Sequence, residues 1–493
     1  MAVRRTSTTD GEGRYEFAEL PAGRYTITVS KAGYVGLQYG QRRPFEPGTP
    51  VILADGQALD ALNVSLPRGS VIAGRVTDEF GEPIASAQVQ AQRYLYGQDG
   101  QRQLQTMNIA SSDDLGQFRV FGLMPGEYVV SAVSRGVNLG SSVIDTSEGY
   151  LPTYYPGTVN LNDAQVISLA VGQETAIQFS LTSGRMARIS GAVADSSGRP
   201  VVGAMLMLRS NSGNSIMTMT AGQTAADGSF SLSNVPTGDH VIEVQPLPRP
   251  GGDPGSLEFA SMPVSVGGSD ISGLRIVTGK GAIVTGRVVF EGQSPRTGGV
   301  TPLRVMPQAV DPGRLMNVFG ATMANGMVAD DGSFELAGAS GQVFFRVATA
   351  PGWTLKSVSL EGEDITDVPF DLTGKETVSG LRIVLTDRLT DVSGQVTDGR
   401  GRALKDYAVV LLPAEPMEGT VARFLRVVRP DQDGRFRVRG MPPGRYVATA
   451  VESLEQGRQF VPEVQRTLRE RGRSFSIAEG ASATLALRLT SPP

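Results

Sequence analysis

Apolar and polar residues alternate along many short stretches of this chain. Residues 25–29 (Tyr-Thr-Ile-Thr-Val) and 74–77 (Gly-Arg-Val-Thr) are typical, and a two-residue period indicates a β-strand with one buried face. Turn residues separate such stretches about every eight to twelve positions, a spacing typical of β-sandwiches. Helical periodicity is scarce, and residues 462–470, which begin with Pro462, form the best candidate for a helix. The pattern therefore predicts an all-β protein.

One motif recurs five times, and its spacing of roughly 100–115 residues is that of whole domains. It consists of an aspartate, a glycine within three positions, an aromatic residue, and then a Pro-Gly or Pro-x-Gly turn that usually leads to a tyrosine. Asp-Gly is a favoured hairpin turn because glycine adopts a positive φ without a Cβ clash. The third copy has His240 in the tyrosine position, and the fourth copy lacks the proline. The motif residues are Asp10, Gly13, Phe17, Gly23 and Tyr25; Asp114, Gly116, Phe118, Gly126 and Tyr128; Asp227, Gly228, Phe230 and Gly238; Asp331, Gly332 and Phe334; and Asp433, Gly434, Phe436, Gly444 and Tyr446.

A Gly-x-Val strand opens each of the last four copies, and two further alternating strands close each unit. The first copy lacks the opening strands, which would leave an open sheet edge, so we expect Met1 to be an internal or truncated start. We predict a tandem array of Ig-like or transthyretin-like β-sandwiches, one partial and four complete. The predicted units are residues 1–69 (partial), 70–185, 186–279, 280–388 (divergent) and 389–493, the last with the expected helix.

Composition excludes several classes of site. The chain has 493 residues, of which 61 are glycine and 30 proline, and much of this surplus falls at the recurring turns. It has no cysteine and one histidine, so disulfides, cysteine-ligated metals and multi-histidine metal sites cannot form. A net charge of −4 gives no general attraction to nucleic acid. No apolar run reaches the roughly 18–20 residues of a membrane helix, and residues 1–7 lack the apolar core of a secretion signal.

The recurring motifs resemble the carboxypeptidase regulatory-like domain, a transthyretin-like, carbohydrate-binding-like sandwich of seven strands. Residues 70–83 and 430–436 are similar to multi-copy proteins of this family of the acidobacterial type. The resemblance implies domains that assist folding or mediate contacts beside catalytic or transport modules. It also implies a location outside the cytoplasm. It implies no peptidase activity, because the chain shows no peptidase domain.

Several side chains are candidates for chemistry. His240 is interpreted as an aromatic substitute in a strand, since no Gly-x-Ser-x-Gly nucleophile motif accompanies it. Asp431 and Asp433 resemble the start of a calcium loop, but the further ligands are missing and hairpin turn chemistry explains them. Exposed tyrosines could stack on sugar rings or protein side chains, or they could cover the sandwich instead. The tyrosines considered for ligand binding are Tyr150, Tyr154, Tyr155, Tyr94 and Tyr96.

We therefore predict a non-catalytic array of the cell envelope or exterior that spaces or binds partners. The partner would be a protein or a glycan, and we expect no cofactor, metal, nucleic acid or membrane-spanning segment. The alternative is a carbohydrate-binding protein that uses the tyrosines. A hydrolase, or an accessory to one, is a third hypothesis, because the chain has 49 acidic residues and motif searches alone cannot exclude a carboxylate pair.

Overall fold

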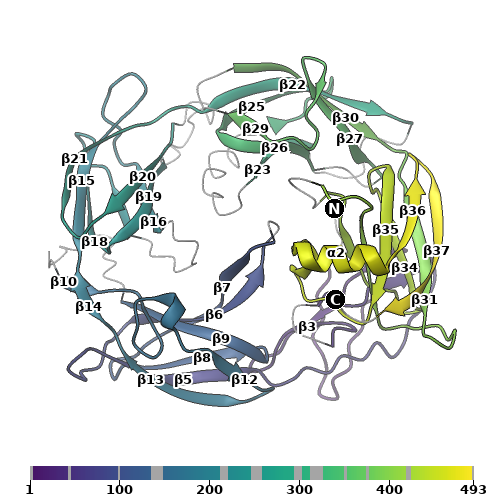
Figure 1. Ribbon diagram of the computed structural model, residues 1–493, viewed down its shortest axis with the longest axis horizontal. Coiled ribbons are helices and arrows are strands. Elements are labelled where there is room, and N and C mark those ends of the chain that lie inside the picture. The colour runs from purple at the N-terminus through teal and green to yellow at the C-terminus, as the bar shows by residue number, and fades with distance from the viewer. Residues whose placement is uncertain are drawn as a thin grey trace.

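The computed structural model describes residues 4–42, 46–97, 100–134, 148–210, 220–245, 258–293, 303–310, 326–348, 352–372, 377–417 and 423–490. These residues form a succession of β-sheets that curves into a closed ring (Figure 1). The prediction of an all-β tandem array is thereby confirmed. We number the units 1 to 5 as above, and their boundaries stay a prediction. No helix among the described residues is long and apolar enough to cross a membrane.

Unit 1 contains only short strands. They are β1 (Gly23–Tyr25), β2 (Thr28–Val29), β3 (Leu37–Gln38) and β4 (Val51–Leu53). β1 pairs with β4 and β2 pairs with β3, both antiparallel. Val35 and Val51 are buried, whereas most other described side chains of this unit are exposed or half-buried. The described residues of unit 1 thus form fewer and shorter strands than those of the other units.

Unit 2 packs two main sheets around one core. Its elements are β5 (Ser70–Thr77), β6 (Ala87–Tyr96), β7 (Arg102–Ser111), β8 (Gln117–Leu123), β9 (Gly126–Ser134), β10 (Glu148–Tyr150), β11 (Thr153–Tyr154), η1 (Leu161–Asp163), β12 (Ile167–Leu169), β13 (Glu174–Ser180) and β14 (Ser183–Arg185). One sheet has the order β13-β5-β8, and in the other β9 pairs with β6, β11 and β12 while β6 also pairs with β7. Ile72, Phe118 and Phe179 from the first sheet meet Val89 and Tyr128 from the second.

Units 3 and 4 follow the same plan. The strands of unit 3 are β15 (Ala187–Ala194), β16 (Met205–Ser210), β17 (Thr220–Gln223), β18 (Ser229–Val235), β19 (Gly238–Gln245), β20 (Ala260–Val266) and β21 (Ile271–Val277). Those of unit 4 are β22 (Ala282–Glu291), β23 (Arg304–Ala309), β24 (Gly326–Met327), β25 (Ser333–Ala339), β26 (Gly341–Val347), β27 (Thr354–Leu360), β28 (Glu363–Asp364), β29 (Phe370–Leu372) and β30 (Thr377–Thr386). The sheet orders are β18-β15-β21 and β17-β16-β19-β20, then β25-β22-β30-β27-β28 and β24-β23-β26-β29.

Unit 5 joins its strands into one seven-stranded sheet and carries the predicted helix. Its elements are β31 (Asp391–Thr397), β32 (Ala408–Pro413), β33 (Arg426–Val428), β34 (Arg435–Arg439), β35 (Gly444–Val451), η5 (Arg458–Phe460), α2 (Pro462–Arg471), β36 (Arg473–Ile477) and β37 (Ser482–Thr490). β37 pairs with β31 and, at its end, with β35. Val464 and Leu468 of α2 pack against β32 and β35, so the helix covers the second face of these strands.

The recurring glycine of the opening strand permits a close approach of two strands. In units 2 to 5 the opening strand lies parallel to a strand from the end of the unit: β5 beside β13, β15 beside β21, β22 beside β30 and β31 beside β37. A Cβ at Gly74 would lie 1.8 Å from the carbonyl oxygen of Ile177, and at Gly191, Gly286 and Gly394 the same contact measures 2.0 Å. The motif phenylalanine stands opposite this glycine on the other side. The pairs are Gly74 with Phe118, Gly191 with Phe230, Gly286 with Phe334, and Gly394 with Phe436.

The recurring tyrosine anchors the turn that precedes it. The hydroxyl groups of Tyr128 and Tyr446 donate to the carbonyl oxygens of Met124 and Pro442, each at 2.7 Å, and Tyr25 donates likewise to Pro21. All three bonds reach back four residues across the Pro-Gly turn. Tyr128 and Tyr446 are buried, so the hydroxyl satisfies a carbonyl group while the ring fills the core.

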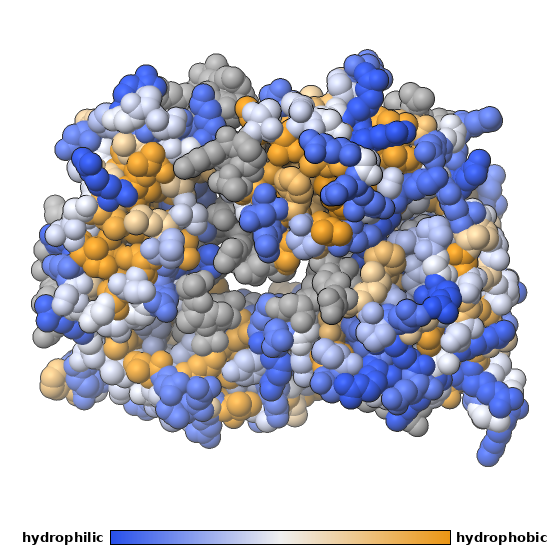
Figure 2. Space-filling model, turned by 45° about the horizontal axis from the view of Figure 1, so that its top comes forward, coloured by the Kyte–Doolittle hydropathy of each residue, from blue (hydrophilic) through white to orange (hydrophobic). Residues whose placement is uncertain are grey.

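Two sets of contacts close the ring. Unit 1 packs on unit 5, where the buried guanidinium of Arg429 lies 3.3 Å from Glu46 and 2.6 Å from Asp406. The β6–β7 hairpin of unit 2 reaches inside the ring toward η5 and α2 (Figure 1), and Arg93 lies 3.3 Å from Glu455 there. Figure 2 shows one face of the molecule, on which polar and apolar side chains are interspersed. The array is thus compact rather than extended.

Candidate binding groove of unit 2

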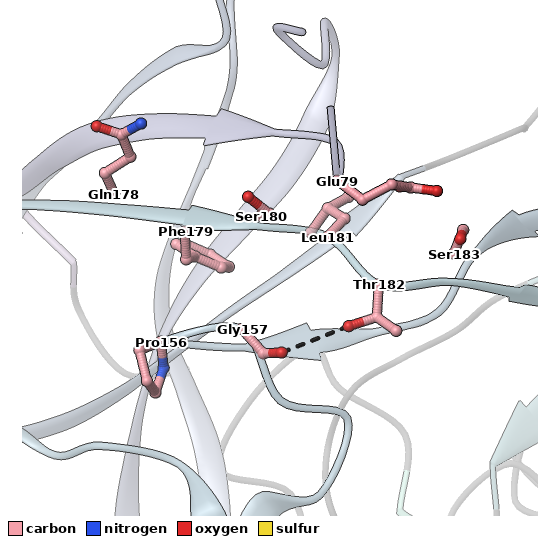
Figure 3. Close-up of a pocket in the computed structure, with 9 residues that line it drawn as sticks. All are labelled: Glu79, Pro156, Gly157, Gln178, Phe179, Ser180, Leu181, Thr182 and Ser183. Carbon is pink, nitrogen blue, oxygen red and sulfur yellow. Dashed lines mark hydrogen bonds between the residues drawn. The ribbon is translucent and has the colours of Figure 1, made fainter. Parts of the chain in front are cut away.

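A groove of about 600 Å³ lies along β13 at one end of unit 2 (Figure 3). Phe179 and Leu181 form its apolar floor. Pro156 and Gly157 form the wall that faces them. Polar side chains complete the lining, namely Glu79, Gln178, Ser180, Thr182 and Ser183. The groove therefore combines an apolar floor with hydroxyl, amide and carboxylate groups at its rim.

The alternation of β13 builds this groove. Ile177, Phe179 and Leu181 are buried in the core, whereas Gln178 and Ser180 are exposed. The Ser180 hydroxyl lies 2.9 Å from that of Thr77, and the Thr182 hydroxyl donates to the carbonyl oxygen of Gly157 at 3.4 Å. The first bond joins β13 to β5, and the second joins the residues that follow β13 to the wall at Gly157.

Acidic groups give one end of the groove a negative character. Tyr150 pairs with Ser183 across β10 and β14, so its backbone lies beside a residue that lines the groove. Burial raises the pKa of Tyr150, and the nearby carboxylates of Asp78 and Glu79 raise this pKa further. The direction of that shift is the one expected where negative charge is concentrated.

The structure divides the five candidate tyrosines between two places. Tyr150 and Tyr155 pack on the main core, and the ring of Tyr155 meets that of Phe179 edge to face at 6.0 Å. Tyr154, which is 4% exposed, packs with Tyr94 in a smaller cluster on the other face of the β6–β7–β9 sheet. Burial raises the pKa of Tyr154 strongly. Ligand binding by these tyrosines stays a prediction, and the structure does not bring the five into one surface.

Tyr94 and Tyr96 belong to the hairpin that reaches inside the ring. The guanidinium of Arg102 lies over the ring of Tyr94, 4.5 Å from its centroid. Tyr96 ends β6 and is half-buried, and its backbone carbonyl lies against Gly457 of unit 5. Both tyrosines therefore lie on the hairpin that helps to close the ring.

His240 lies in a strand position that tyrosine fills in other copies. It is 3% exposed, and its Nε2 is 2.9 Å from the carbonyl oxygen of Pro236, four residues earlier. This contact is the one that the tyrosine hydroxyls make. Nδ1 is buried without a hydrogen-bond partner among the described residues. The geometry is that of a turn anchor.

The hairpin aspartates bind backbone amides of their own turns. Asp431 Oδ1 accepts hydrogen bonds from the amides of Asp433 at 3.0 Å and Arg435 at 2.9 Å. In unit 2 the accepting carboxylate is that of Asp113, the residue directly before the motif residue Asp114. Asp227 and Asp331 also accept from the amide two residues on, each at 2.9 Å, but they stand directly before the turn glycine, whereas Asp431 stands three positions before it. Asp10, Asp113 and Asp431 thus stand three positions before the turn glycine and Asp227 and Asp331 directly before it, and a search for Asp-Gly spacing does not separate the two positions.

These carboxylates do not converge with one another. Within the part of the chain that the structure describes, no three acidic or histidine side chains are grouped so that they could hold a metal ion. Sequence reasoning missed Glu79 and the residues 178–183 that line the groove. A position-by-position alignment of the five units could have found Glu79, because it follows the strand glycine at the same distance as Glu291 does in unit 4.

Comparison with known proteins identifies the repeated unit. The family model of the carboxypeptidase regulatory-like domain matches residues 2–67, 71–182 and 188–255. A search among curated proteins found no match. Solved structures similar to the chain include the Bacillus anthracis TIE protein, at 10% identity over 85% of this chain and 73% of that one, with a TM-score of 0.16. Another is GBS52, the minor pilin of Streptococcus agalactiae, at 13% identity over 43% and 94% of the two chains, with a TM-score of 0.21.

Proposed function

We propose, from the premise that this chain is a multi-copy carboxypeptidase regulatory-like domain protein, that it is a non-catalytic platform whose units present contact surfaces to partners. We place it in the cell envelope or outside the cell. The family resemblance supports this location.

The observation that carries the proposal is that the recurring residues lie inside the sandwiches, whereas the elements that differ between units lie at the surface. The recurring glycine, phenylalanine and tyrosine are all used inside the sandwiches, where they set strand spacing and anchor a turn. The parts that differ between units are the groove with residues 148–158, the long β6–β7 hairpin and α2. Surface elements that vary on a constant scaffold are the usual carriers of binding.

The closed ring favours a contact platform over a spacer. A spacer would keep its first and last units far apart, whereas units 1 and 5 here share the buried Arg429–Glu46 pair. The ring instead holds all five units at fixed positions around one centre (Figure 1). Partner binding is therefore the first role that we propose, and spacing is the second.

Labelling of intact cells tests the location. A membrane-impermeant amine reagent should label the chain in intact cells, or in cells whose outer membrane has been permeabilised, while a cytoplasmic marker enzyme stays unlabelled. Labelling that appears only after complete lysis would place the protein in the cytoplasm and contradict this part of the proposal.

Carbohydrate recognition is the alternative for the tyrosine residues. A ring that stacks on a sugar needs an exposed face, and the low exposure of Tyr154 together with the Tyr155–Phe179 contact supports a packing role for both. A glycan pull-down with the parent chain and with Tyr154→Ala and Tyr155→Ala tests the alternative. Retention of a glycan by the parent and its loss in both variants would establish it.

A further inference from the structure

We propose that unit 1 accepts a β-strand from a second protein, and that this strand fills the place which the opening strand fills in units 2 to 5. The donated segment is extended and carries an isoleucine or valine, then a glycine two positions later and a valine two positions after that. This inference rests on the proposed function and names the partner class for one unit. Strand addition supplies backbone hydrogen bonds for affinity, and side-chain sites supply specificity.

Unit 1 contains both neighbours of the missing strand. In units 2 to 5 the opening strand lies between the strand of the Asp-Gly motif and a strand from the end of the unit, as β5 lies between β8 and β13. In unit 1 the corresponding segments are residues 14–18, after the motif turn, and residues 61–66. Among the described residues no strand pairs with either segment. Both flanks are therefore present, and the strand between them is not.

Tyr15 marks the position of the missing glycine on the first flank. It follows the turn glycine Gly13 by two positions, as Phe118 follows Gly116, and both turn glycines have a positive φ. Phe118 stands opposite Gly74 of β5. A glycine of the added strand therefore stands opposite Tyr15.

Leu62 marks the same position on the second flank. It follows Ala61, whose φ is 59°, and Leu381 of unit 4 likewise follows Gly380, whose φ is 81°. Leu381 pairs with the strand glycine Gly286. A glycine of the added strand therefore stands beside Leu62.

A hydrogen bond across the gap joins these two positions. The Tyr15 hydroxyl donates to the carbonyl oxygen of Leu62, so the two residues that mark the glycine face each other. In unit 4 a Cβ at Gly286 would lie 2.8 Å from the ring of Phe334 and 2.0 Å from the carbonyl oxygen of Leu381. A side chain at the same place in unit 1 would meet the corresponding two groups, and glycine avoids them.

The apolar side chains that line this place are only half-buried. They are Tyr15, Phe17, Leu62, Val64 and Leu66, and they alternate with exposed residues as in a strand. Their counterparts in unit 4 are at most 5% exposed, namely Phe334, Leu336, Leu381, Ile383 and Leu385. The uncovered part of unit 1 is thus the part that the opening strand covers in the other units.

The opening strands of the other units define the apolar side chains of the donor. Each has an isoleucine or valine two positions before the glycine and a valine two positions after it, and all of these are buried. The sequence has this pattern at residues 72–76, 189–193, 284–288 and 392–396. Each of the four strands is paired on both sides within its own unit. A second copy of the chain therefore offers no free strand of this pattern, and the donor is a different protein.

A charge on the first flank refines the donor further. Glu16 is exposed and has no charged partner among the described residues. In the register above, the residue before the donor's glycine lies opposite Glu16, as Ala73 of β5 lies opposite Arg119 in unit 2. Opposite charges in such cross-strand pairs stabilise a sheet, so the donor carries a lysine or arginine there.

A fluorescent peptide of residues 70–78, which contains β5, is the probe. Fluorescence polarisation with the full chain should show saturable binding. The matched control is the peptide with both Ala73→Gly and Gly74→Ala, which has the same composition but places a methyl group against the carbonyl of Leu62. Its affinity should be about tenfold lower or weaker still. Ala73→Lys in the peptide should strengthen binding about two- to fivefold, and Glu16→Lys in the chain should remove that gain.

Two further measurements locate the bound peptide. Val64→Lys in the chain should abolish binding, because the donor's valine packs there, whereas Ser65→Lys at the neighbouring exposed position should not. A photo-reactive leucine analogue in place of Val76 of the peptide should cross-link the unmodified chain at residues 14–18 or 61–66. Cross-linking needs no variant of the chain, so it locates the peptide even if Val64→Lys unfolds unit 1.

The absence of peptide binding, or equal affinity for the exchanged control peptide, would overturn the proposal. So would cross-links confined to units 2 to 5, which would mean that the peptide displaces an opening strand. A dimer of the chain that the peptide dissociates would assign the place to a second copy. A form of the chain extended before residue 1 that no longer binds the peptide would assign it to the chain's own segment, and either result would overturn the assignment to a second protein. None of these outcomes affects the labelling test of location, so the two proposals fail separately.

Discussion

At the residue scale, His240 shows how one bond can be kept while the side chain changes. Its Nε2 makes the contact to Pro236 that tyrosine hydroxyls make in other copies. We expect His240→Tyr to leave the free energy of unfolding nearly unchanged. His240→Phe should lower it by about 1–2 kcal/mol, because the carbonyl of Pro236 loses its partner. Urea denaturation measures both, and equal losses in the two variants would contradict the anchor role.

Glu243 has a buried carboxylate that accepts no hydrogen bond from the described residues. It is 3% exposed, its oxygens lack hydrogen-bond partners among the described residues, and Arg209 Nε lies 3.7 Å away. Desolvation raises the pKa of Glu243 above the ordinary value of 4.5. The folded state therefore binds this proton more tightly than the unfolded state does, and its stability decreases as the pH rises from 4.5 to the raised pKa.

Glu243→Gln should consequently stabilise the protein at pH 7, by about 1–3 kcal/mol as for other unsatisfied buried groups. The gain should shrink as the pH is lowered through the raised pKa toward 4.5, because the parent side chain becomes neutral there. Thermal unfolding at several pH values measures the difference. A gain that does not depend on pH would show that charge is not its cause.

Single residues also mark the limit of what the sequence predicts. The structural role of His240 and the turn role of the aspartates follow from the repeats, since a residue that replaces another at a fixed position inherits its surroundings. The motif search selects Asp114 and Asp433 because they lie nearer to the turn glycine, whereas the carboxylates that accept the turn hydrogen bonds are those of Asp113 and Asp431, which spacing alone does not identify. Glu79 was missed because it meets residues 178–183, which lie about 100 positions further along the chain, only after folding.

At the element scale, the glycines of the opening strands control strand spacing. A Cβ at Gly394 would lie 2.0 Å from the carbonyl oxygen of Leu485, and backbone cannot move aside cheaply. We expect Gly394→Ala to destabilise unit 5 by about 1–3 kcal/mol, the range for overpacked sites. Gly399→Ala is the control in the same unit, because its Cβ would have no atom within 4 Å. Similar unfolding midpoints for the two variants would contradict this account.

Strands and the helix could be predicted better than their pairing. Alternation identified the strands, and Pro462 marked the start of α2, because these signals are local. The parallel pairing of β5 with β13 joins residues about 100 positions apart, and no local pattern encodes it. The recurring Gly-x-Val was visible in the sequence, but its reason became clear only from the neighbouring strand.

At the scale of the whole molecule, the Arg429 guanidinium links the ends of the array. Its side chain is 3% exposed and that of Glu46 is 5% exposed. We expect Arg429→Met to cost about 3–5 kcal/mol, since it breaks a buried ion pair by removing one of its two partners. Arg445→Met is the control, because the Arg445–Glu415 pair is exposed and such pairs contribute about 0–1 kcal/mol. Limited proteolysis should release unit 1 from the first variant and not from the second.

The hairpin contact provides a second, independent test of the ring. Gly457 has a φ of 90°, and a Cβ there would lie 2.2 Å from the carbonyl oxygen of Tyr96. Gly457→Ala should therefore separate the hairpin from unit 5, which small-angle X-ray scattering would detect as a larger radius of gyration. Gly401 shares the left-handed backbone, with φ of 80°, but a Cβ there would meet no atom within 4 Å. Gly401→Ala is therefore the control: it should introduce the same backbone strain but leave the ring closed. Of the two glycines, Gly457 is the one that also contacts unit 2. Equal radii for the two variants would mean that the hairpin does not hold the ring.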